Sequence, residues 1–389
     1  MPWTRYAVAL AAALALLAPA GGCKKKKTDE IVVGHYGSMT GEQATFGKST
    51  QMGIDLALDE INAKGGVLGK KVRVAAEDTR GLEPDAKTAA QRLVDKENVV
   101  ALIGEVASGC SIAAAPVAQA AKIPMLSPAS TNPEVTKKGD YIFRSCFIDP
   151  FQGPAMAKFA MRENKPDAPG LGLKKFAVLF ANNAPYSVGL KDEFIRAVKE
   201  MGGEITAVES YAQGDANYTG QLTKIRDAAV KADAIYVPGY YSHVGQICRD
   251  ARNLGLTVPL MGGDGWDSSK LAEIGGDAIN GCYFTNHYSA EEDRPEVQAF
   301  VESFKRKFNG EVPDAMAILG YDAMRIMADA IQRAGSTDGA KIRDALAKTR
   351  DFAGATGKIT INADRNAEKP LVVLKIVNKQ FKFVARIDP

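Results

Sequence analysis

Residues 31–78 decide the fold, and they read IVVGHYGSMTGEQATFGKSTQMGIDLALDEINAKGGVLGKKVRVAAED. The stretch begins with a β-branched run at 31–37 and ends with another at 71–78, and such runs are typical of strands. Between them, residues 49–66 carry apolar side chains at helical spacing, and Gly65 supplies the stop signal. Because a helical crossover joins parallel strands, this stretch predicts a strand–helix–strand unit with its two strands parallel.

The same alternation continues over most of the chain. Six further strand-like runs occupy residues 99–105, 123–128, 175–181, 204–211, 233–239 and 258–264. Helix-like segments separate them, which predicts parallel sheets covered by helices on both faces. A single sheet of more than about ten strands would be exceptional, so a chain of 389 residues predicts an α/β fold of two doubly wound lobes.

Two interruptions predict where the chain passes between the lobes. The first is FIDPFQGPAMAKFA at 147–160, where two prolines and a glycine break the pattern before a new helix. The second is FTNHYSAEEDRP at 284–295, after which two helical stretches lead to the tail 371–387. The two alternating runs of this tail meet at Asn378 and Lys379, so we expect a hairpin that joins the edge of a sheet.

The N-terminus predicts export. Residues 1–22, MPWTRYAVALAAALALLAPAGG, have the form of a signal peptide, and their apolar run 7–18 is too short to span a bilayer. Small residues at 20–22 precede Cys23, as in the lipobox of bacterial lipoproteins, although Ala20 stands where that pattern usually has Leu. We therefore predict a periplasmic or cell-surface protein that is anchored in a membrane through a lipidated Cys23.

An alternative for this N-terminus stays open. An ordinary signal peptide cleaved near residues 18–20 would leave Cys23 as a stray thiol. In the lipoprotein interpretation, residues 23–30 are the lipidated cysteine and a lysine-rich tether, and the lysines at 24–27 could also touch anionic head groups.

Composition and cysteine spacing exclude several classes of protein. With 46% hydrophobic and 24% charged residues the chain has the composition of a folded soluble protein, and a net charge of +3 is too small to steer it onto nucleic acid. Four cysteines follow the predicted signal: Cys110, Cys146, Cys248 and Cys282. They form no CxxC pair and no zinc-site spacing, so we expect no metal. Disulfides and buried free thiols both remain open for them.

Two loops predict an anion site at one end of the sheets. Ligands of open α/β sheets bind beyond the carboxyl ends of the strands. Ser108 follows one predicted strand at the position of a helix N-cap, with unpaired N–H groups behind it that attract a carboxylate. Ala129, Ser130 and Thr131 follow another strand with further hydroxyls and amides. Plain capping without a ligand is the commoner role for either loop alone.

Two loops in the second half predict the opposite preference. Tyr240 and Tyr241 follow the strand-like run 233–239, and Asp264 lies between glycines with Trp266 beside it. An acid flanked by aromatic rings suits an ammonium group, through a charge-assisted hydrogen bond and a cation–π contact. In isolation, Asp264 would be interpreted as a turn residue, but together the loops predict a zwitterion held between the lobes.

These segments together resemble a known family. They are GSMTGEQATFG (37–47), STQMGIDLALDEINAKGGVLGKKV (49–72), IPMLSPASTNPEVT (123–136), YIFRSCFIDPFQG (141–153) and YVPGYYSHVGQICRDARNLGL (236–256). The chain resembles the branched-chain amino acid (leucine, isoleucine, valine) binding proteins of bacterial ABC importers, in their lipoprotein form. The resemblance implies a type I periplasmic binding protein fold, with two Rossmann-like lobes joined by three crossover strands that act as a hinge. It places lobe 1 at 31–151 plus 285–370, and lobe 2 at 152–284 plus 371–389.

The resemblance also implies a ligand site. It assigns the ligand carboxylate to Ser108, Thr131 and the backbone of Ala129, the ammonium to Tyr240 and Asp264, and the side-chain pocket to Phe46, Tyr186 and Met316. Ser130 is a further candidate from the same loop as Ala129 and Thr131. Asp264 stands where the family has Glu, and Phe46 stands where it has Tyr. The disulfide of the family is not matched, because its two positions are not cysteine here. An amino acid ligand is therefore implied more firmly than a branched one.

Two rival functions are an enzyme and a sensor. An enzyme is not favoured, because His35, His243 and His287 lie in unrelated segments and no catalytic set accompanies them. The FGKST sequence at 46–50 fails as a phosphate loop, since Glu42 stands where glycine is required. We predict a monomeric solute-binding protein without cofactor whose partner is an ABC permease, and the alternative is an extracytoplasmic amino acid or amide sensor that signals to a membrane receptor.

Overall fold

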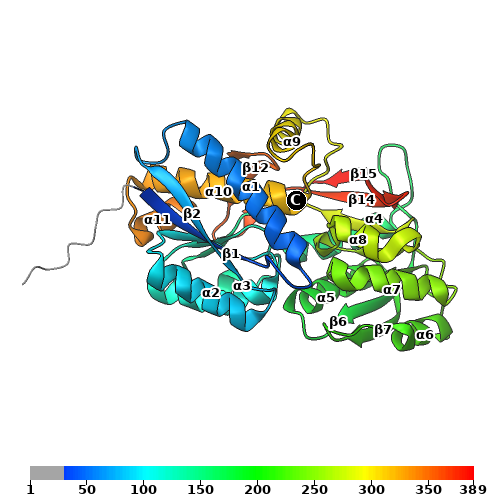
Figure 1. Ribbon diagram of the computed structural model, residues 1–389. Helices are drawn as coiled ribbons and strands as arrows, with labels where there is room; N and C mark the ends of the chain where they lie inside the picture. The colour runs from blue at the N-terminus through cyan, green and yellow to red at the C-terminus, as the bar shows by residue number, and fades with distance from the viewer. Residues whose placement is uncertain (1–29) are drawn as a thin grey trace, which may run out of the picture.

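The computed structural model describes residues 30–389, which form two α/β lobes side by side (Figure 1). This confirms the predicted fold class. The predicted signal peptide, Cys23 and most of the tether lie outside the described residues. Within residues 30–389, no helix is both long enough and apolar enough to cross a membrane.

Lobe 1 is built on a parallel sheet with strand order β2-β1-β3-β4-β5. Its strands are β1 (Glu30–Gly37), β2 (Lys71–Asp78), β3 (Ala101–Ile103), β4 (Met125–Ser127) and β5 (Ile142–Arg144). Its helices are α1 (Ala44–Ala63), α2 (Glu83–Lys96) and α3 (Ser108–Ala121), with α9 (Pro295–Lys307), α10 (Ala315–Ala334) and α11 (Gly339–Ala347) from later in the chain. Helices α2 and α3 pack together on one face of the sheet, while α1 and α10 pack on the other (Figure 1).

Lobe 2 repeats this strand order and extends it. Its sheet runs β7-β6-β8-β9-β10-β14-β15, with the last two strands antiparallel. The strands are β6 (Lys175–Ala181), β7 (Glu204–Tyr211), β8 (Ala234–Tyr236), β9 (Leu260–Gly262), β10 (Tyr283–Asn286), β14 (Leu371–Val377) and β15 (Gln380–Ile387). The helices are α4 (Asp149–Met161), α5 (Pro185–Glu200), α6 (Thr219–Asp227), α7 (Tyr241–Asn253) and α8 (Ser269–Gly275).

The predicted C-terminal hairpin is confirmed. Strands β14 and β15 are joined by Asn378 and Lys379, which both have positive φ, as the favoured two-residue hairpin turn requires. The hairpin joins the edge of the lobe 2 sheet because β14 pairs with β10. A small sheet of β11 (Phe352–Gly354), β12 (Gly357–Ile361) and β13 (Ala367–Glu368) was not predicted.

The chain passes between the two sheets three times, in segments 145–148, 287–294 and 369–370. These segments, here called crossovers 1, 2 and 3, contain no assigned strand, but each directly adjoins one. The prediction that the prolines and the glycine of 147–160 interrupt the pattern before a new helix was wrong, because these residues lie within the helix itself. Helix α4 begins at Asp149, tolerates Pro150 in its first turn and continues through Pro154.

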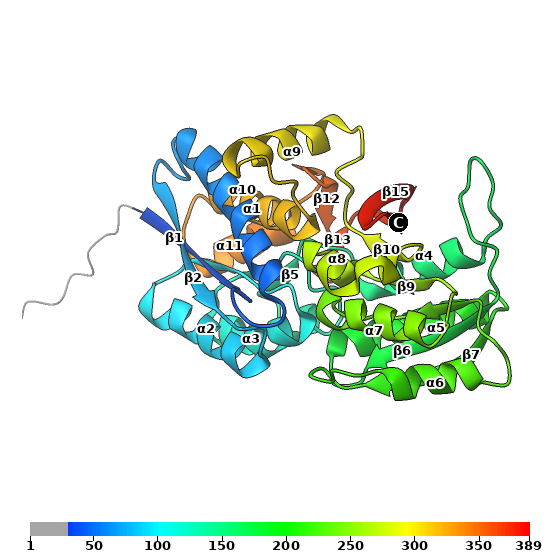
Figure 2. The same cartoon turned by 45° about the vertical axis from the view of Figure 1, so that its right-hand side comes forward.

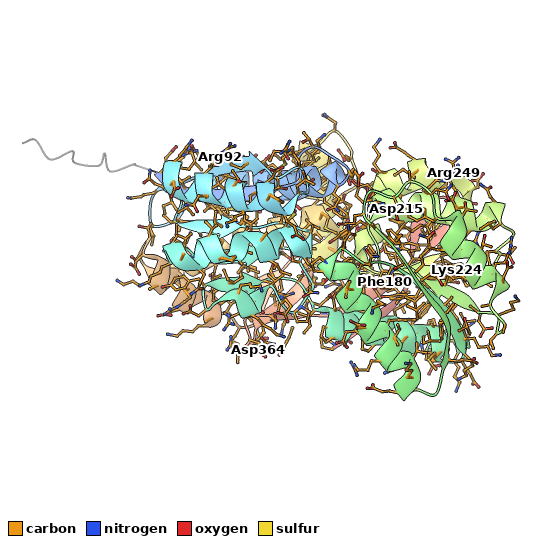
Figure 3. The ribbon with its side chains drawn as sticks, turned by 90° about the horizontal axis from the view of Figure 1, so that it is seen from below. Arg92, Phe180, Asp215, Lys224, Arg249 and Asp364 are labelled. Carbon is orange, nitrogen blue, oxygen red and sulfur yellow. The ribbon has the colours of Figure 1, made fainter. Side chains whose placement is uncertain are left out.

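The charged outer faces of the lobes lie away from the junction between them. Seen from below, Arg92 on α2 of lobe 1 and Lys224 and Arg249 on α6 and α7 of lobe 2 project outward (Figure 3). The loops that follow β1 and β3 approach those that begin α5 and α7, where the two lobes meet (Figure 2). The sequence-predicted site residues come from the loops after β3, β4, β8 and β9 and from the first turns of α1, α5 and α10.

Candidate ligand-binding site

The site lies where the strand order reverses in both lobes, between β1 and β3 and between β6 and β8. Such switch points are where open α/β sheets bind ligands. The lobes are in direct contact here. The ring of Phe46 packs edge-on against the rings of Tyr240 and Tyr241, with centroid distances of 6.0 Å and 4.9 Å. The hydroxyls of Thr45 in lobe 1 and Ser268 in lobe 2 are 2.9 Å apart. All nine predicted site residues are buried at or near this junction.

The predicted anion loops are adjacent in space. Ser108 is the first residue of α3 and Ala107 is the N-cap, so the prediction of Ser108 as the cap was wrong by one residue. The Ser108 hydroxyl instead accepts a hydrogen bond from the backbone N–H of Asn132, at 3.3 Å. The hydroxyl oxygen of Thr131 is buried and has no hydrogen-bond partner within residues 30–389. The two loops therefore present the first turn of α3 and a free hydroxyl on the same side.

Ser130 differs from Thr131, because its hydroxyl belongs to the framework. It bonds to the carbonyl oxygens of Glu105 and Val106, both at 3.0 Å, and to the hydroxyl of Ser111 at 2.8 Å. The Glu105 carbonyl also accepts from Ser111 and Ser127. This network fixes the loop after β4 against the start of α3, and it occupies the hydroxyl that was predicted to touch a ligand.

Arg144, which sequence reasoning did not single out, holds the other side of this loop. Its fully buried guanidinium donates to the carbonyl oxygens of Ser130 at 2.6 Å and Asn132 at 2.8 Å. Burial lowers the pKa of Arg144. The only signal in the sequence was its place in the segment YIFRSCFIDPFQG, which carried part of the family resemblance.

Asp264 lies at the opposite side of the site. Its carboxylate is buried, and it accepts hydrogen bonds from the Tyr186 hydroxyl at 3.0 Å and from Nε2 of His287 at 3.1 Å. Its backbone N–H donates to Oε1 of Gln152 at 2.8 Å. The ring of Tyr240 stacks on that of Tyr186 at 5.0 Å, so Tyr186 lies between the two predicted ammonium contacts. Burial and then the nearby Asp264 raise the pKa of the Tyr186 hydroxyl, which therefore stays protonated.

Trp266 does not take the place expected of it. Its indole N–H donates to the carbonyl oxygen of Val237 at 3.0 Å, and its ring stacks on Phe284 in the core of lobe 2. The aromatic rings that accompany Asp264 are those of Tyr186 and Tyr240 instead.

Asp149 is a second buried acid near the site that was not predicted. Neither carboxyl oxygen makes a well-formed hydrogen bond within residues 30–389, but the neighbouring hydroxyl of Thr131 lies close enough to lower the pKa of the carboxyl. Burial raises the pKa of Asp149 to about 8, with a further contribution from Asp264. The carboxyl is therefore largely protonated at neutral pH and can donate a hydrogen bond.

Unpaired polar atoms gather around Asp264. In the part of the chain that the structure describes, Thr131 Oγ1, both oxygens of Asp149, Gln152 Nε2 and His287 Nδ1 are buried without a partner. Because buried polar groups are normally hydrogen-bonded, such a group of unpaired atoms indicates a place for a polar ligand.

Apolar side chains complete the site. Met316, at the start of α10, is fully buried in the same hydrophobic cluster as Phe46, Tyr186 and Tyr240. Most of α10 packs in a separate cluster within lobe 1, so Met316 is one of its few side chains that reach the junction.

The four cysteines of the described chain are buried free thiols, and residues 30–389 contain no group of three or more His, Cys, Asp or Glu side chains that could hold a metal ion.

Comparison with known proteins agrees with this architecture. A family model described as "Periplasmic binding protein" matches residues 30–380. The chain belongs to this family. Members are solute-binding proteins, which indicates an exported binding protein and confirms the resemblance inferred from the sequence.

Three relatives illustrate the range of ligands. A Leu/Ile/Val-binding protein, BraC3 of Rhizobium johnstonii, is 30% identical over 85% of this chain and 87% of its own. The solved structure of a leucine binding protein, LivK of Thermotoga maritima, is 42% identical over 92% of this chain and 99% of its own, with a TM-score of 0.86. A solute binding protein of an ABC transporter from Rhodopseudomonas palustris, solved with 3,4-dihydroxybenzoic acid, is 26% identical over 92% and 98%, with a TM-score of 0.80.

Proposed function

We propose that the protein captures a free amino acid with a branched aliphatic side chain between its lobes and delivers it to an ABC importer. The observation that carries the proposal is the buried carboxylate of Asp264. Its partners are Tyr186 and His287, and no Lys or Arg of residues 30–389 forms an ion pair with it. A buried carboxylate without a cation is costly, and the ammonium group of an amino acid would supply that cation.

The other end of the ligand suits an α-carboxylate. The first N–H groups of α3 and the unpaired hydroxyl of Thr131 are donors, and a helix N-terminus favours an anion. Ser108 and the backbone of Ala129 complete the carboxylate contacts, while Ser130 supports them through its framework bonds.

The apolar wall supports an aliphatic side chain. Phe46, Tyr186, Tyr240 and Met316 lie in one buried cluster at the junction. Relatives named for leucine, isoleucine and valine agree with this choice. An aromatic acid such as that bound by the Rhodopseudomonas relative has no ammonium group, so it would leave Asp264 without a counter-charge.

Calorimetric titration with matched ligands tests this proposal. We expect leucine, isoleucine or valine to bind, and 4-methylpentanoate, which is leucine without its amine, to bind roughly 100-fold more weakly or worse. Isopentylamine, which lacks the carboxylate, should lose affinity similarly. Binding of 3,4-dihydroxybenzoate together with no binding of the three amino acids would overturn the proposal.

We propose the lobe boundaries inferred from the resemblance as the units that move. Lobe 1 would comprise 31–151 plus 285–370, and lobe 2 would comprise 152–284 plus 371–389, with crossovers 1 to 3 as the hinge. The assignment of the strands to two sheets supports a division near these positions, but residue 151 lies within α4 and residue 285 within β10, so the crossovers place the first two boundaries a few residues away.

Membrane anchoring is a further part of the proposal. Removal of residues 1–22 and lipidation of Cys23 would tether the binding protein near its permease. Cells that make Cys23→Ala should release the protein in soluble form, whereas the parent should sediment with membranes. Equal release of both would show that Cys23 carries no lipid.

The importer role is distinguished from a sensor role by the partner. We expect the monomeric, cofactor-free protein to be retained by the permease encoded with it, in a ligand-dependent manner. Retention by a signalling receptor instead would favour the sensor.

A further inference from the structure

His287 contacts the carboxylate that we propose as the ammonium acceptor. It is the first residue of crossover 2, and its imidazole is buried. Nε2 lies 3.1 Å from Oδ2 of Asp264, and because a carboxylate can only accept, Nε2 carries the hydrogen. The other ring nitrogen, Nδ1, has no hydrogen-bond partner within residues 30–389. The imidazole therefore reaches the site from the hinge through a single polar contact.

Crossover 1 is in contact with this imidazole, and crossover 3 acts on it through charge. Its ring stacks on that of Phe147 in crossover 1, with centroids 3.9 Å apart and planes 20° from parallel. The charge of Lys369 in crossover 3 acts on it as well, and the buried ammonium of Lys369 donates to the hydroxyl of Thr356 at 2.7 Å. A change in the relative position of the lobes must rearrange these segments, and with them the partner of Asp264.

We propose that His287 is a positioning residue that orients Asp264 for the ligand ammonium and links occupancy of the site to the hinge. This inference rests on the proposed function. With one oxygen held by Tyr186 and the other by His287, the Asp264 carboxylate is fixed in direction. Its remaining lone pairs are left for the ligand, since each carboxylate offers about four acceptor positions.

The charge of the imidazole determines how strongly Asp264 attracts the ligand ammonium. A neutral His287 leaves the negative charge of Asp264 for the ligand, whereas a protonated one would neutralise it and compete with the ammonium. Lys369 opposes protonation and Asp264 favours it, but burial is the largest influence and lowers the pKa of His287. The neighbouring thiol of Cys146 has a pKa raised by burial to about 12 and stays neutral. The site is therefore poised to bind at neutral pH.

Two variants separate positioning from general packing. His287→Met removes the donor while it keeps an apolar side chain of moderate volume, and His287→Gln keeps an N–H donor but cannot titrate. His35→Gln is the matched control, because His35 is equally buried but lies in β1, where its Nδ1 contacts Gln51 at 2.6 Å. Each protein is titrated with leucine and with 4-methylpentanoate at pH 5 and pH 8, and its thermal unfolding is recorded.

We expect a different pattern of ligand binding for each of these proteins. His287→Met should weaken leucine binding at pH 8 by about 10-fold to 100-fold, and should change binding of 4-methylpentanoate much less. His287→Gln should recover most of that loss, and its leucine affinity relative to wild type should rise from pH 8 to pH 5 as the wild-type imidazole gains a proton. His35→Gln should leave both ratios unchanged.

The outcomes also separate this role from the function on which it rests. If His287→Met does not fold, the pH dependence of the ratio between His287→Gln and wild type still decides. Wild type that binds leucine, with variants that match it at both pH values, would overturn the role of His287 alone. Wild type that binds none of the three branched amino acids would overturn the proposed function and this inference together.

Discussion

Ser130 and Thr131 are adjacent in the chain, yet their hydroxyls have opposite environments. That of Ser130 is engaged by Glu105, Val106 and Ser111, while that of Thr131 has no partner within residues 30–389. A sequence pattern can indicate that a loop has donors, but which donor faces the ligand depends on tertiary contacts. At the scale of single residues, function follows from what each polar atom has left to bond.

The contrast predicts separable effects of two substitutions. Thr131→Ala should weaken leucine binding by roughly 1.5–3 kcal/mol, because it removes a hydrogen bond to a charged ligand group, and should change the unfolding temperature little. Thr131→Ser keeps the hydroxyl and is its control. Ser130→Ala should instead lower the free energy of unfolding by about 1–3 kcal/mol, since the buried carbonyl oxygen of Val106 loses the hydroxyl donor. The carbonyl oxygen of Glu105 keeps its bonds from Ser111 and Ser127. Calorimetry and thermal unfolding on all three decide, and equal losses of affinity for Ser130→Ala and Thr131→Ala would contradict this division.

A second prediction concerns the carboxylate of Asp264, which we expect to be required for binding the ligand ammonium. Asp264→Ala should cost about 3–5 kcal/mol of leucine binding, because the ligand ammonium would be enclosed without a counter-charge. Binding of 4-methylpentanoate should not fall, as it has no ammonium. Calorimetry with both compounds gives the comparison, and a variant that retained wild-type affinity for leucine would show that the ammonium lies elsewhere.

Sequence reasoning named residues that the fold brings to the junction between the lobes, but it did not name the residues that support them. The helix start at Ser108 was within one residue, because capping signals are local. His287 was considered only as a catalytic residue and Asp149 was not singled out, because their contacts come from crossovers and helix starts that only the folded chain brings to Asp264. Trp266 was misplaced for the related reason that proximity in sequence to Asp264 does not say on which side of the loop an indole lies.

At the level of elements, the longer strands were predicted to within one residue and the short ones were not. Strands β2, β6 and β7 have seven or eight residues each, enough for their pattern to be distinct. Strand β5 has three residues, one of them the buried Arg144, and carries no such pattern. It exists because β4 offers it a parallel edge. The small sheet of β11 to β13 was missed for a similar reason, since β13 has only two residues.

Helices α1 and α10 of lobe 1 pack against each other at unusually close range. A Cβ added at Gly53 of α1 would overlap the carbonyl oxygen of Ala317, and one added at Gly320 of α10 would overlap that of Thr50. The two backbones therefore touch where both residues are glycine. This close approach brings the first turn of α10, with Met316, toward the junction.

Glycine substitutions test this packing. Gly53→Ala should destabilise the protein by about 1–3 kcal/mol or more, because the backbone atoms it meets cannot move aside without separating the helices. Gly220→Ala is the matched control, since Gly220 lies in α6 with nothing within 4 Å of the added Cβ, and it should be neutral or stabilise by up to about 1 kcal/mol. Chemical denaturation measures both, and equal stability of the two variants would contradict the packing argument.

At the scale of the whole molecule, the lobes are held together by contacts that surround the site. Besides Thr45 and Ser268, the side chain of Asn132 in lobe 1 donates to the carbonyl oxygen of Pro185 in lobe 2 at 2.8 Å. The carboxylate of Asp267 in lobe 2 accepts from the backbone N–H of Ala315, the first residue of α10, at 2.7 Å. Each contact requires the lobes to be close, so we expect closure of the lobes to enclose the proposed ligand.

Asp314 makes this closure dependent on pH. It caps α10 through the N–H of Ala317 and accepts from the Ser49 hydroxyl at 2.6 Å. Burial, and then the nearby Asp267, raise its pKa to about 7. An acid with a raised pKa binds its proton more tightly in the closed molecule than where it is solvated, so protonation stabilises closure. Between its ordinary pKa of about 4 and a pH of about 7, the closed state should therefore lose stability as pH rises.

Asp314→Asn tests this sign, because asparagine caps a helix as well as aspartate and carries no charge. The leucine affinity of the variant relative to wild type should rise by at least about tenfold from pH 5 to pH 8, because the ionised Asp314 of wild type is buried beside Asp267 when the lobes close. Calorimetry at both pH values gives the ratio. Comparing proteins that differ only at position 314 cancels the titration of His287, which acts in the opposite direction. If the affinity of the variant relative to wild type stayed constant from pH 5 to pH 8, closure of the lobes would not change the proton affinity of Asp314.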